Sequence, residues 1–565
     1  MARIDTAVLA RQPSAPRIDG WAAGALLVAG LIATPIIAVI LLAVAPSDDI
    51  WHHLASTVLP HYLVTTALLA TGVGVGTTII GVGTAWLVTM CRFPMRSIFE
   101  WALLLPLAVP SYVVAYVYTD ILEYAGPLQA ALRENFGWAS RQAYWFPEIR
   151  SLGGAIAMMT LVLYPYVYLL ARAAFLEQSV CVLEVSRTLG KGPWKSFFRV
   201  ALPLARPAIV IGLTLVMMET LNDFGTVDFF AVATLTTGIY DVWLNMNSTA
   251  GAAQLAVLTL GIVVLLIIVE RWARRRKRFH HTTSRYRALA TAPLSPSRAV
   301  LAFLACLTPV LLGFVVPATQ LVRFAFSHRP AIETDSFLEL AANSLALASI
   351  TAGLAVGVGL FLAYGVRVSR SPWLAAAARF ASIGYAIPGA VLAVGVVVPL
   401  AAWDNAVDAV ARAQFGVSPG LLLSGTVFAM VFGYLVRFLA LSYGTIEAGL
   451  GKVTPSMDGA ARTLGHAPFS VLRRVHLPLL RGSLLTAAIL VFVDCMKELP
   501  LTLLLRPFNF ETLATNVHQL ASAELLEQSA RGALAIVAAG ILPVIALSRT
   551  IRRSRPGQAP IGNRS

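Results

Sequence analysis

Long apolar runs alternate with short polar segments along the whole chain. Twelve of these runs are about 20 residues long, which is the length that an α-helix needs to cross roughly 30 Å of hydrocarbon. The pattern therefore predicts an all-α polytopic membrane protein with about 12 transmembrane helices. Their centres lie near Leu31, Val75, Val109, Leu163, Leu213 and Val263 in the first half, and near Leu311, Ala355, Val391, Phe432, Ile489 and Val537 in the second.

Two polar segments between apolar runs, 184–203 and 458–478, match each other. An offset of about half the 565-residue chain indicates an internal duplication. We expect a first half (1–270), a basic cytoplasmic linker (271–297) and a second half (298–565). The matched positions include Arg187/Arg462, Thr188/Thr463, Leu189/Leu464, Gly190/Gly465, Pro193/Pro468, Arg199/Arg474 and Pro203/Pro478.

Composition and charge agree with this class. Charged residues make up 13% of the chain, whereas a soluble domain is about a quarter charged. The formal net charge of +15 comes from Lys and Arg in short segments beside apolar runs, so we expect no nucleic-acid partner. Most of the 43 Lys and Arg residues fall in the cytoplasm if the N-terminus is placed there. Because positive residues mark cytoplasmic loops, both termini, the linker and both repeated segments are predicted to be cytoplasmic.

An even number of spans in each half gives both halves the same direction in the membrane, which makes a parallel repeat. Pro110 and Pro388 interrupt the third predicted span of their halves. A proline frees a backbone carbonyl inside a membrane helix. Each proline therefore predicts a kink, which serves either a transport pathway or helix packing.

The repeated segments have the pattern of a helix, a turn and a second helix. Residues 184–189 suit a short helix, and Gly190 suits the left-handed conformation that ends one. Pro193 suits the first position of a second helix over 194–200, and Pro203 then opens the next span. Apolar and basic side chains would be exposed on the cytoplasmic face, which predicts that this helix binds in a groove of a partner protein. The alternative is a loop resting on anionic lipid headgroups.

These segments resemble the cytoplasmic EAA motif of ABC importer permeases, in outline Glu-Ala-Ala, three residues, Gly, nine residues, a hydrophobic residue, one residue and Leu-Pro. In that family the motif forms coupling helices that dock into the ATP-hydrolysing subunits. The resemblance implies a type I importer fold, two cytoplasmic ABC ATPase subunits, a periplasmic substrate-binding protein and surrounding lipid as partners. The second copy departs from the motif, because Gly459 stands where Glu is usual. The positions expected to carry ATPase coupling are Glu184, Arg187, Gly190, Pro203, Asp458, Arg462, Gly465 and Pro478.

Two further segments are similar to the fused permeases of the ferric-iron type. They are Glu219-Thr-Leu-Asn-Asp-Phe-Gly-Thr-Val-Asp-Phe-Phe230 and Lys497-Glu-Leu-Pro-Leu-Thr-Leu-Leu-Leu-Arg-Pro507. The resemblance covers nearly the whole chain and implies a multi-pass subunit of the bacterial inner membrane that moves ferric iron into the cytoplasm by alternating access. Permeases for thiamine, phosphonates or polyamines share parts of these segments, so those substrates stay open.

Four acids, Glu219, Asp223, Asp494 and Glu498, lie at the end of the fifth predicted span of each half. Members of each pair are four residues apart, which predicts that they share one helix face. Intramembrane acids usually face the protein interior or a watery cavity, and carboxylate oxygens suit a hard ferric ion. We therefore expect them to line the substrate path without forming a fixed metal site. In the alternative, structural reading, Asp494 pairs with Lys497 and Asn222-Asp223 caps a re-entrant turn.

Other functional classes fit less well. The chain lacks the Gly-x-x-x-x-Gly-Lys-Ser/Thr loop that cradles phosphates, so ATP hydrolysis is expected on a separate subunit. No spacing predicts an enzyme's nucleophile and base, and no cofactor is expected. An ion-gradient secondary transporter with two parallel six-helix halves would explain the duplication, but not the two matched helix–Gly–Pro segments.

Overall fold

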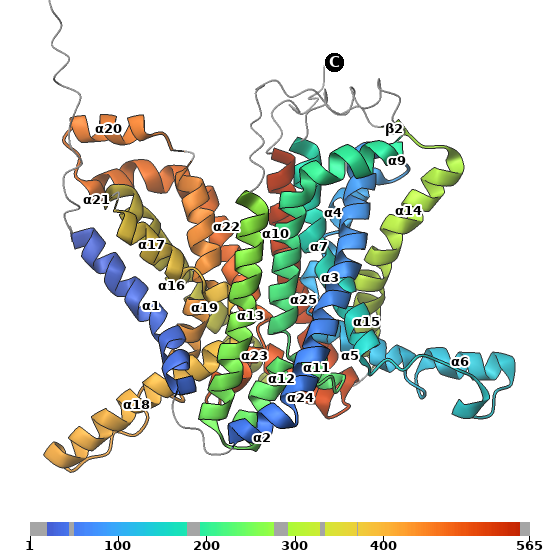
Figure 1. Cartoon of the computed structure of the whole chain (residues 1–565), viewed down its shortest axis with the longest axis horizontal. Coiled ribbons are helices and arrows are strands. Elements are labelled where there is room, and N and C mark those ends of the chain that lie inside the picture. Colours follow the sequence, from blue (N-terminus) through green and yellow to red (C-terminus); the bar gives the residue numbers. More distant parts are fainter. Residues whose placement is uncertain are drawn as a thin grey trace, which may run out of the picture.

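The computed structural model describes residues 20–44, 50–177, 193–275, 292–327, 334–369, 371–451 and 453–553. In these ranges, eleven helices are long and apolar enough to cross a membrane. A twelfth span results if the bent pair Arg96–Ala108 and Ser111–Phe136 is counted as one. The predicted all-α polytopic fold is therefore confirmed (Figure 1).

The first half contains helices that run between the two ends of the molecule and short helices at those ends. Its elements are α1 (Gly20–Val44), α2 (Ile50–Ser56), α3 (Leu59–Met90), β1 (Cys91–Arg92), α4 (Arg96–Ala102), η2 (Leu105–Ala108), α5 (Ser111–Leu122), α6 (Pro127–Phe136), η3 (Arg141–Ala143), α7 (Leu152–Glu177), α9 (Pro193–Ser196), η4 (Phe197–Ala201), α10 (Leu202–Asn222), α11 (Gly225–Phe229), α12 (Leu235–Tyr240), η5 (Asp241–Asn245) and α13 (Thr249–Arg275).

The second half has the same succession of long helices, with differences in the short elements between them. Its elements are β2 (Ala292–Pro293), α14 (Pro296–Val310), η6 (Leu311–Val315), α15 (Val316–Ser327), α16 (Thr334–Ser369), α17 (Pro372–Ala381), η7 (Gly384–Ala386), α18 (Gly389–Phe415), α19 (Val427–Leu450), α20 (Pro455–Thr463), α21 (Pro468–Val471), η8 (Leu472–His476), α22 (Leu477–Met496), α23 (Pro500–Leu505), α24 (Leu513–Ser522) and α25 (Leu526–Arg553). Strands β1 and β2 pair in parallel.

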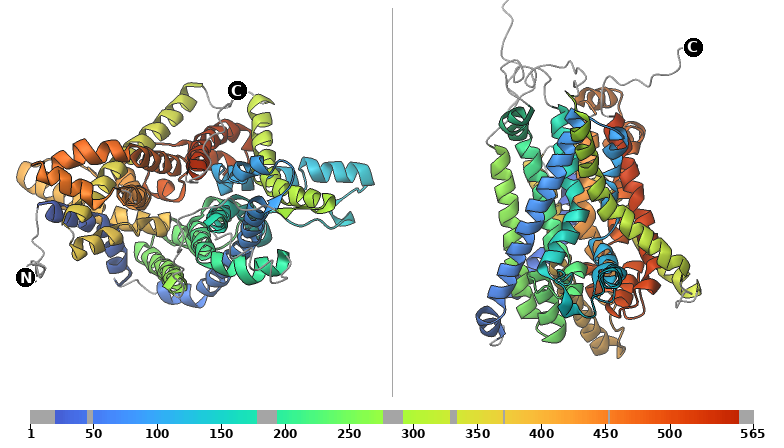
Figure 2. Two further views of the ribbon diagram at one scale, coloured as in Figure 1. Left: turned by 90° about the horizontal axis from the view of Figure 1, so that it is seen from above. Right: turned by 90° about the vertical axis from the view of Figure 1, so that its right-hand side faces the viewer.

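The first long helix of each half packs against the other half. Helix α1 contacts α16, α17 and α18, while α14 contacts α3 and α4. In the view from above, blue α1 accordingly lies among the yellow and orange helices, and yellow-green α14 lies beside the blue and cyan ones (Figure 2). The small residues Ala22, Ala25 and Ala29 are buried on α1, and small side chains let membrane helices approach closely.

The duplication extends to individual hydrogen bonds. Thr234 and Thr512 each cap a short helix, α12 and α24, with the same capping box. The next backbone N–H donates in both halves to a hydroxyl on a long helix, from Leu235 to Thr66 over 3.0 Å and from Leu513 to Ser344 over 2.8 Å. The parallel repeat predicted from the two loops therefore holds at the opposite end of the molecule as well.

Both predicted proline interruptions are present. A short 3₁₀ turn, η2 or η7, precedes an extended residue and a proline, after which a new helix begins. Val109 and Ile387 have ψ near 125° and 128°, because a following proline disfavours the helical conformation. In the first half the two helical segments meet at 90°. The breaks direct Ser111 and Gly389, the residues after the prolines, to the interior.

Candidate functional site

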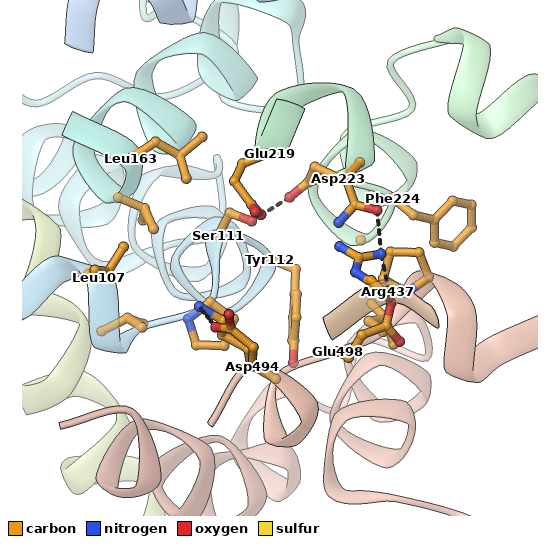
Figure 3. A pocket seen from close by; sticks show the side chains of 18 of the residues that line it. Leu107, Ser111, Tyr112, Leu163, Glu219, Asp223, Phe224, Arg437, Asp494 and Glu498 are labelled. Carbon is orange, nitrogen blue, oxygen red and sulfur yellow. Dashed lines mark hydrogen bonds and ion pairs between the residues drawn. The ribbon is translucent and has the colours of Figure 1, made fainter. Parts of the chain in front are cut away.

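A polar cavity lies between the two halves, where α10 and α22 end (Figure 3). Its volume of about 90 Å³ has room for several water molecules. Both halves contribute to it, and all four predicted acids line it. The polar and charged lining residues are Ser111, Tyr112, Tyr166, Glu219, Asn222, Asp223, Tyr385, Arg437, Asp494, Lys497 and Glu498.

The expectation that each acid pair shares one helix face is wrong. Helices α10 and α22 end at Asn222 and Met496, so Asp223 and Glu498 lie beyond them. Each instead accepts hydrogen bonds at the start of the next short helix. Asp223 accepts from the Thr226 N–H at 2.9 Å, and Glu498 accepts from the Leu501 and Thr502 N–H groups at 3.0 Å. Orphan N–H groups at a helix start favour such a carboxylate.

Glu498 is also paired with a buried cation. Its Oε1 lies 3.3 Å from Nη1 of Arg437, and the two side chains are only 2% and 5% exposed. The same Nη1 donates to the Asn222 side-chain oxygen at 2.7 Å, which also accepts from the Gly389 N–H at 2.7 Å. Arg437 on α19 therefore connects the acid of its own half to the end of α10 in the other.

The remaining acids differ in their partners. Asp494 forms an ion pair of 2.9 Å with Lys497, as in the structural alternative. Glu219 accepts from the Tyr385 hydroxyl at 2.7 Å, and Asp223 accepts from the Ser111 hydroxyl. Within the described part of the chain, neither first-half acid pairs with Lys or Arg. Two of the four carboxylates thus have fixed counter-charges, and two do not.

Sequence reasoning missed Arg437, Tyr385, Ser111 and Asn222 as parts of the site. Arg437 had a usable signal, because an arginine within an apolar run is costly in a membrane and usually has a partner there. Tyr385 and Ser111 had none, since each depends on contact with residues more than 100 positions away. Tyr112 also lines the cavity and is buried.

The second repeated segment folds as a helix, a turn and a helix at the end of the molecule opposite α2 and α24 (Figure 1). Gly465 follows α20 with a φ of 81°, the left-handed conformation expected of the turn glycine. Pro468 begins α21 as predicted. In the first segment, Pro193 begins α9 and Pro203 lies in the first turn of α10. Glu184, Arg187 and Gly190 lie outside the described residues.

The second short helix of each segment was expected to end before the span, and this is wrong. Helices α9 and α21 continue through the π turns η4 and η8 into α10 and α22. Pro203 and Pro478 each follow such a turn. A proline lacks a backbone N–H and its ring crowds the preceding turn. The wider π turn relieves this crowding, so the helix continues without a break.

Side chains of the second half bind the Asp458 carboxylate on α20. Its carboxylate pairs with Nε of Arg367 at 2.8 Å and lies 2.9 Å from Nε2 of His476. Arg367 also donates to the carbonyls of Leu450 and Val453, at 2.6 and 2.8 Å. This network fixes α20 to the ends of α16 and α19. Arg462 lies on the same helix, and its side chain is outside the described part.

Apolar side chains are exposed on both repeated segments. Met457, Leu464 and Phe469 are 46%, 77% and 64% exposed, and Phe198 of the first segment is 58% exposed. Basic Lys195 and Arg199 are exposed beside Phe198. These surfaces have the apolar and basic character that was expected of a docking face.

At the end of the molecule opposite α20, His518 on α24 contacts two residues of the first half. Its Nδ1 lies 2.7 Å from the Tyr116 hydroxyl, and its Nε2 lies 3.6 Å from Asp228. Burial lowers the pKa of His518 to about 4, and burial raises the pKa of Asp228 to about 6. The imidazole is therefore neutral at pH 7, so this contact is not an ion pair at that pH.

The two-half membrane fold and its matched segments are typical of a transporter subunit. Residues 77–279 and 355–554 each match the family described as binding-protein-dependent transport system inner membrane component. The chain belongs to this family and carries two copies of its domain, as the duplication predicted. It is thus an inner membrane component.

Some relatives match most of this chain, and others match about a third of it. The chain is 26% identical over 488 residues to the Fe(3+)-transport system permease protein FbpB 2 of Haemophilus influenzae, covering 86% of this chain and 88% of the relative. It is 22% identical over 447 residues to the ferric transport system permease protein FbpB of Actinobacillus pleuropneumoniae, covering 75% and 61%. The molybdenum transport system permease protein ModB of Escherichia coli is 27% identical over 204 residues, covering 35% of this chain and 86% of ModB.

Proposed function

We propose that this chain is the permease subunit of an ATP-driven importer that moves ferric iron from the periplasm to the cytoplasm. The observation that carries the proposal is the likeness to relatives named as ferric-iron permeases, which extends over both halves of the chain. The likeness to the named molybdenum permease spans 35% of this chain. The proposed mechanism is alternating access, with the two halves moving relative to each other around the cavity.

The cavity supports a cationic substrate. Four carboxylates and two basic side chains line it, and both basic groups are already paired with carboxylates. Glu219 and Asp223 remain as oxygen ligands without a basic partner among the described residues, and ferric iron favours such ligands. An oxyanion such as molybdate would instead need N–H donors or unpaired cations.

The family and the exposed repeated segments support a proposal for the partners. We propose that two cytoplasmic ATPase subunits bind the two segments, one each, and that a periplasmic binding protein delivers substrate at the opposite end. The exposed Phe198, Leu464 and Phe469 suit insertion into grooves on the ATPases. Closure of the ATPase dimer would then move α10 and α22 through the helices that join them to the segments.

The orientation is tested with topology reporters. The charge distribution predicts that both termini and the 271–297 linker are cytoplasmic. A reporter that is active only in the periplasm should therefore be inactive when fused after Ser565. The same reporter inserted after Gly137, at the end of α6, should be active. A periplasmic signal from the Ser565 fusion would overturn the proposed topology.

The substrate is tested by removing one charge from the cavity. Glu219→Gln keeps an acceptor for Tyr385 but removes a carboxylate that has no basic partner among the described residues. We expect uptake of radiolabelled iron to fall about tenfold, because one unit charge near a cation is worth at least ~1.4 kcal/mol inside a protein. Uptake is measured in vesicles that contain the whole complex, with the binding protein supplied.

Glu134→Gln, on the exposed surface of α6, is the matched control and should transport normally. Wild-type iron uptake by Glu219→Gln would remove this acid from the path. If the intact complex took up labelled molybdate, thiamine or a phosphonate but no iron, the proposal that ferric iron is the substrate would be wrong.

A further inference from the structure

The two halves bind their equivalent acids in different ways. Asp223 and Glu498 occupy the same place in the repeat, and each caps the short helix that follows. In the first half the Ser111 hydroxyl completes the binding of Asp223. Gly389 takes the place of Ser111 in the second half, directly after the matching proline, and the guanidinium of Arg437 binds Glu498 instead. At the position equivalent to Arg437 the first half has Val162.

The glycine and the arginine depend on each other. A Cβ at Gly389 would lie 2.6 Å from Nη1 of Arg437 and 3.0 Å from Oε1 of Glu498. The first distance is shorter than a Cβ contact allows and the second is tight, so any larger residue would push the guanidinium of Arg437 from its present position. The absence of a side chain at Gly389 thus makes room for a cation where the first half has a hydroxyl.

In the space beside Gly389, the guanidinium of Arg437 contacts the other half. Nη1 of Arg437 reaches the side-chain oxygen of Asn222, the last residue of α10, at 2.7 Å. The Gly389 N–H donates to the same oxygen. One amide of the first half therefore accepts two hydrogen bonds from the second, next to the cavity, in a partly buried setting. Hydrogen bonds to charged groups are stronger there than in water.

We propose that Arg437 and Asn222 form a latch that holds the two halves together across the cavity, and that the transport cycle has to break it. The proposal rests on the proposed transport function but not on the identity of the substrate. Arg437 is a positioning residue here. It keeps its ion pair with Glu498 throughout the cycle, while Asn222 leaves with α10 when the halves separate.

The asymmetry gives the latch a moderate strength. If Arg437 had its only carboxylate partner on the opposite half, opening would leave a buried charge without a partner, which is very costly. Because Glu498 lies on the same half as Arg437, opening takes from Arg437 only its hydrogen bond to a neutral amide. A charge-assisted hydrogen bond of this kind can hold the resting state and still yield to ATP binding.

The test removes the latch from the Asn222 side, which leaves Arg437 and Glu498 paired. In the purified permease–ATPase complex in lipid nanodiscs, Asn222→Ala should raise ATP hydrolysis in the absence of binding protein by roughly tenfold. The stimulation by binding protein should fall by a similar factor. Asn222→Asp, which places a charge opposite Arg437, should lower the maximal rate of transport severalfold.

Ser442→Ala is the matched control. Its hydroxyl donates to the Ala355 carbonyl at 2.7 Å from the same helix as Arg437, but within one half, so the stimulation by binding protein should stay as in the wild type. Unchanged basal hydrolysis and unchanged stimulation in Asn222→Ala would overturn the latch. No iron is needed for this assay, so failure of the latch is distinguishable from an incorrect substrate.

Discussion

Replacing Glu498 with Ala should cost this protein about 3–5 kcal/mol of stability, which is the usual cost of leaving one member of a buried ion pair unpaired. Glu498 is 2% exposed, it pairs with Arg437, and it caps α23 through two backbone N–H groups. The substitution removes the counter-charge and the cap together. We expect a marked fall in the thermal unfolding midpoint of the purified protein in detergent.

The control is Glu524→Ala, because Glu524 has a 79% exposed side chain that lies 3.6 Å from Arg150. Exposed ion pairs contribute little, so its unfolding midpoint should stay close to that of the wild type. A double variant, Glu498→Gln with Arg437→Met, should regain much of the lost stability, since replacing both members of a buried pair is often tolerated. Equal midpoints for Glu498→Ala and Glu524→Ala would show that the buried pair is not structural.

Replacing Gly465 with Val should uncouple ATP hydrolysis from transport. Gly465 has a φ of 81° at the turn between α20 and α21, and a β-branched residue is strained there by about 1–2 kcal/mol or more. The turn would relax to another conformation and redirect α20, which presents Met457, and the adjoining Leu464. We expect uptake to fall at least roughly tenfold, while the chain remains in the membrane.

Gly459→Ala provides the comparison, because a Cβ added at this helical glycine would meet no other atom within 4 Å and alanine favours the helix. It should transport like the wild type. The two measurements are substrate uptake and co-purification of the ATPase. Normal uptake by Gly465→Val, together with normal ATPase binding, would exclude this turn from coupling.

The sequence was sufficient for most of the fold because its signals are local and repeated. Apolar run length indicates spans, the prolines at 110 and 388 indicate breaks, and the left-handed glycine at 465 indicates a turn. The two copies strengthened each of these, since the same pattern recurred after half the chain. The all-α class and the parallel repeat followed from these features alone.

The site was only partly predictable because its contacts are not local. The four acids were found from their rarity within the membrane, but their helical spacing suggested a shared face that the helix ends at Asn222 and Met496 exclude. The partner of Glu498 lies 61 residues away, and that of Glu219 lies 166 residues away. No periodicity reveals such pairs. The reason for Gly389 at the position equivalent to Ser111 could not be predicted either, because it depends on the contact with Arg437.

The packing of α1 against the other half has a consequence for biosynthesis. Its partner helices α16, α17 and α18 are made much later than α1 itself. Between Val44 and Pro372 the ribosome adds more than 300 residues, which takes about 15–65 s at 5–20 residues per second. During that time α1 can pack against α13 and, once it is made, against α16, but not yet against α17 and α18. Joining both halves in one polypeptide ensures that each nascent α1 meets the partner made on the same ribosome.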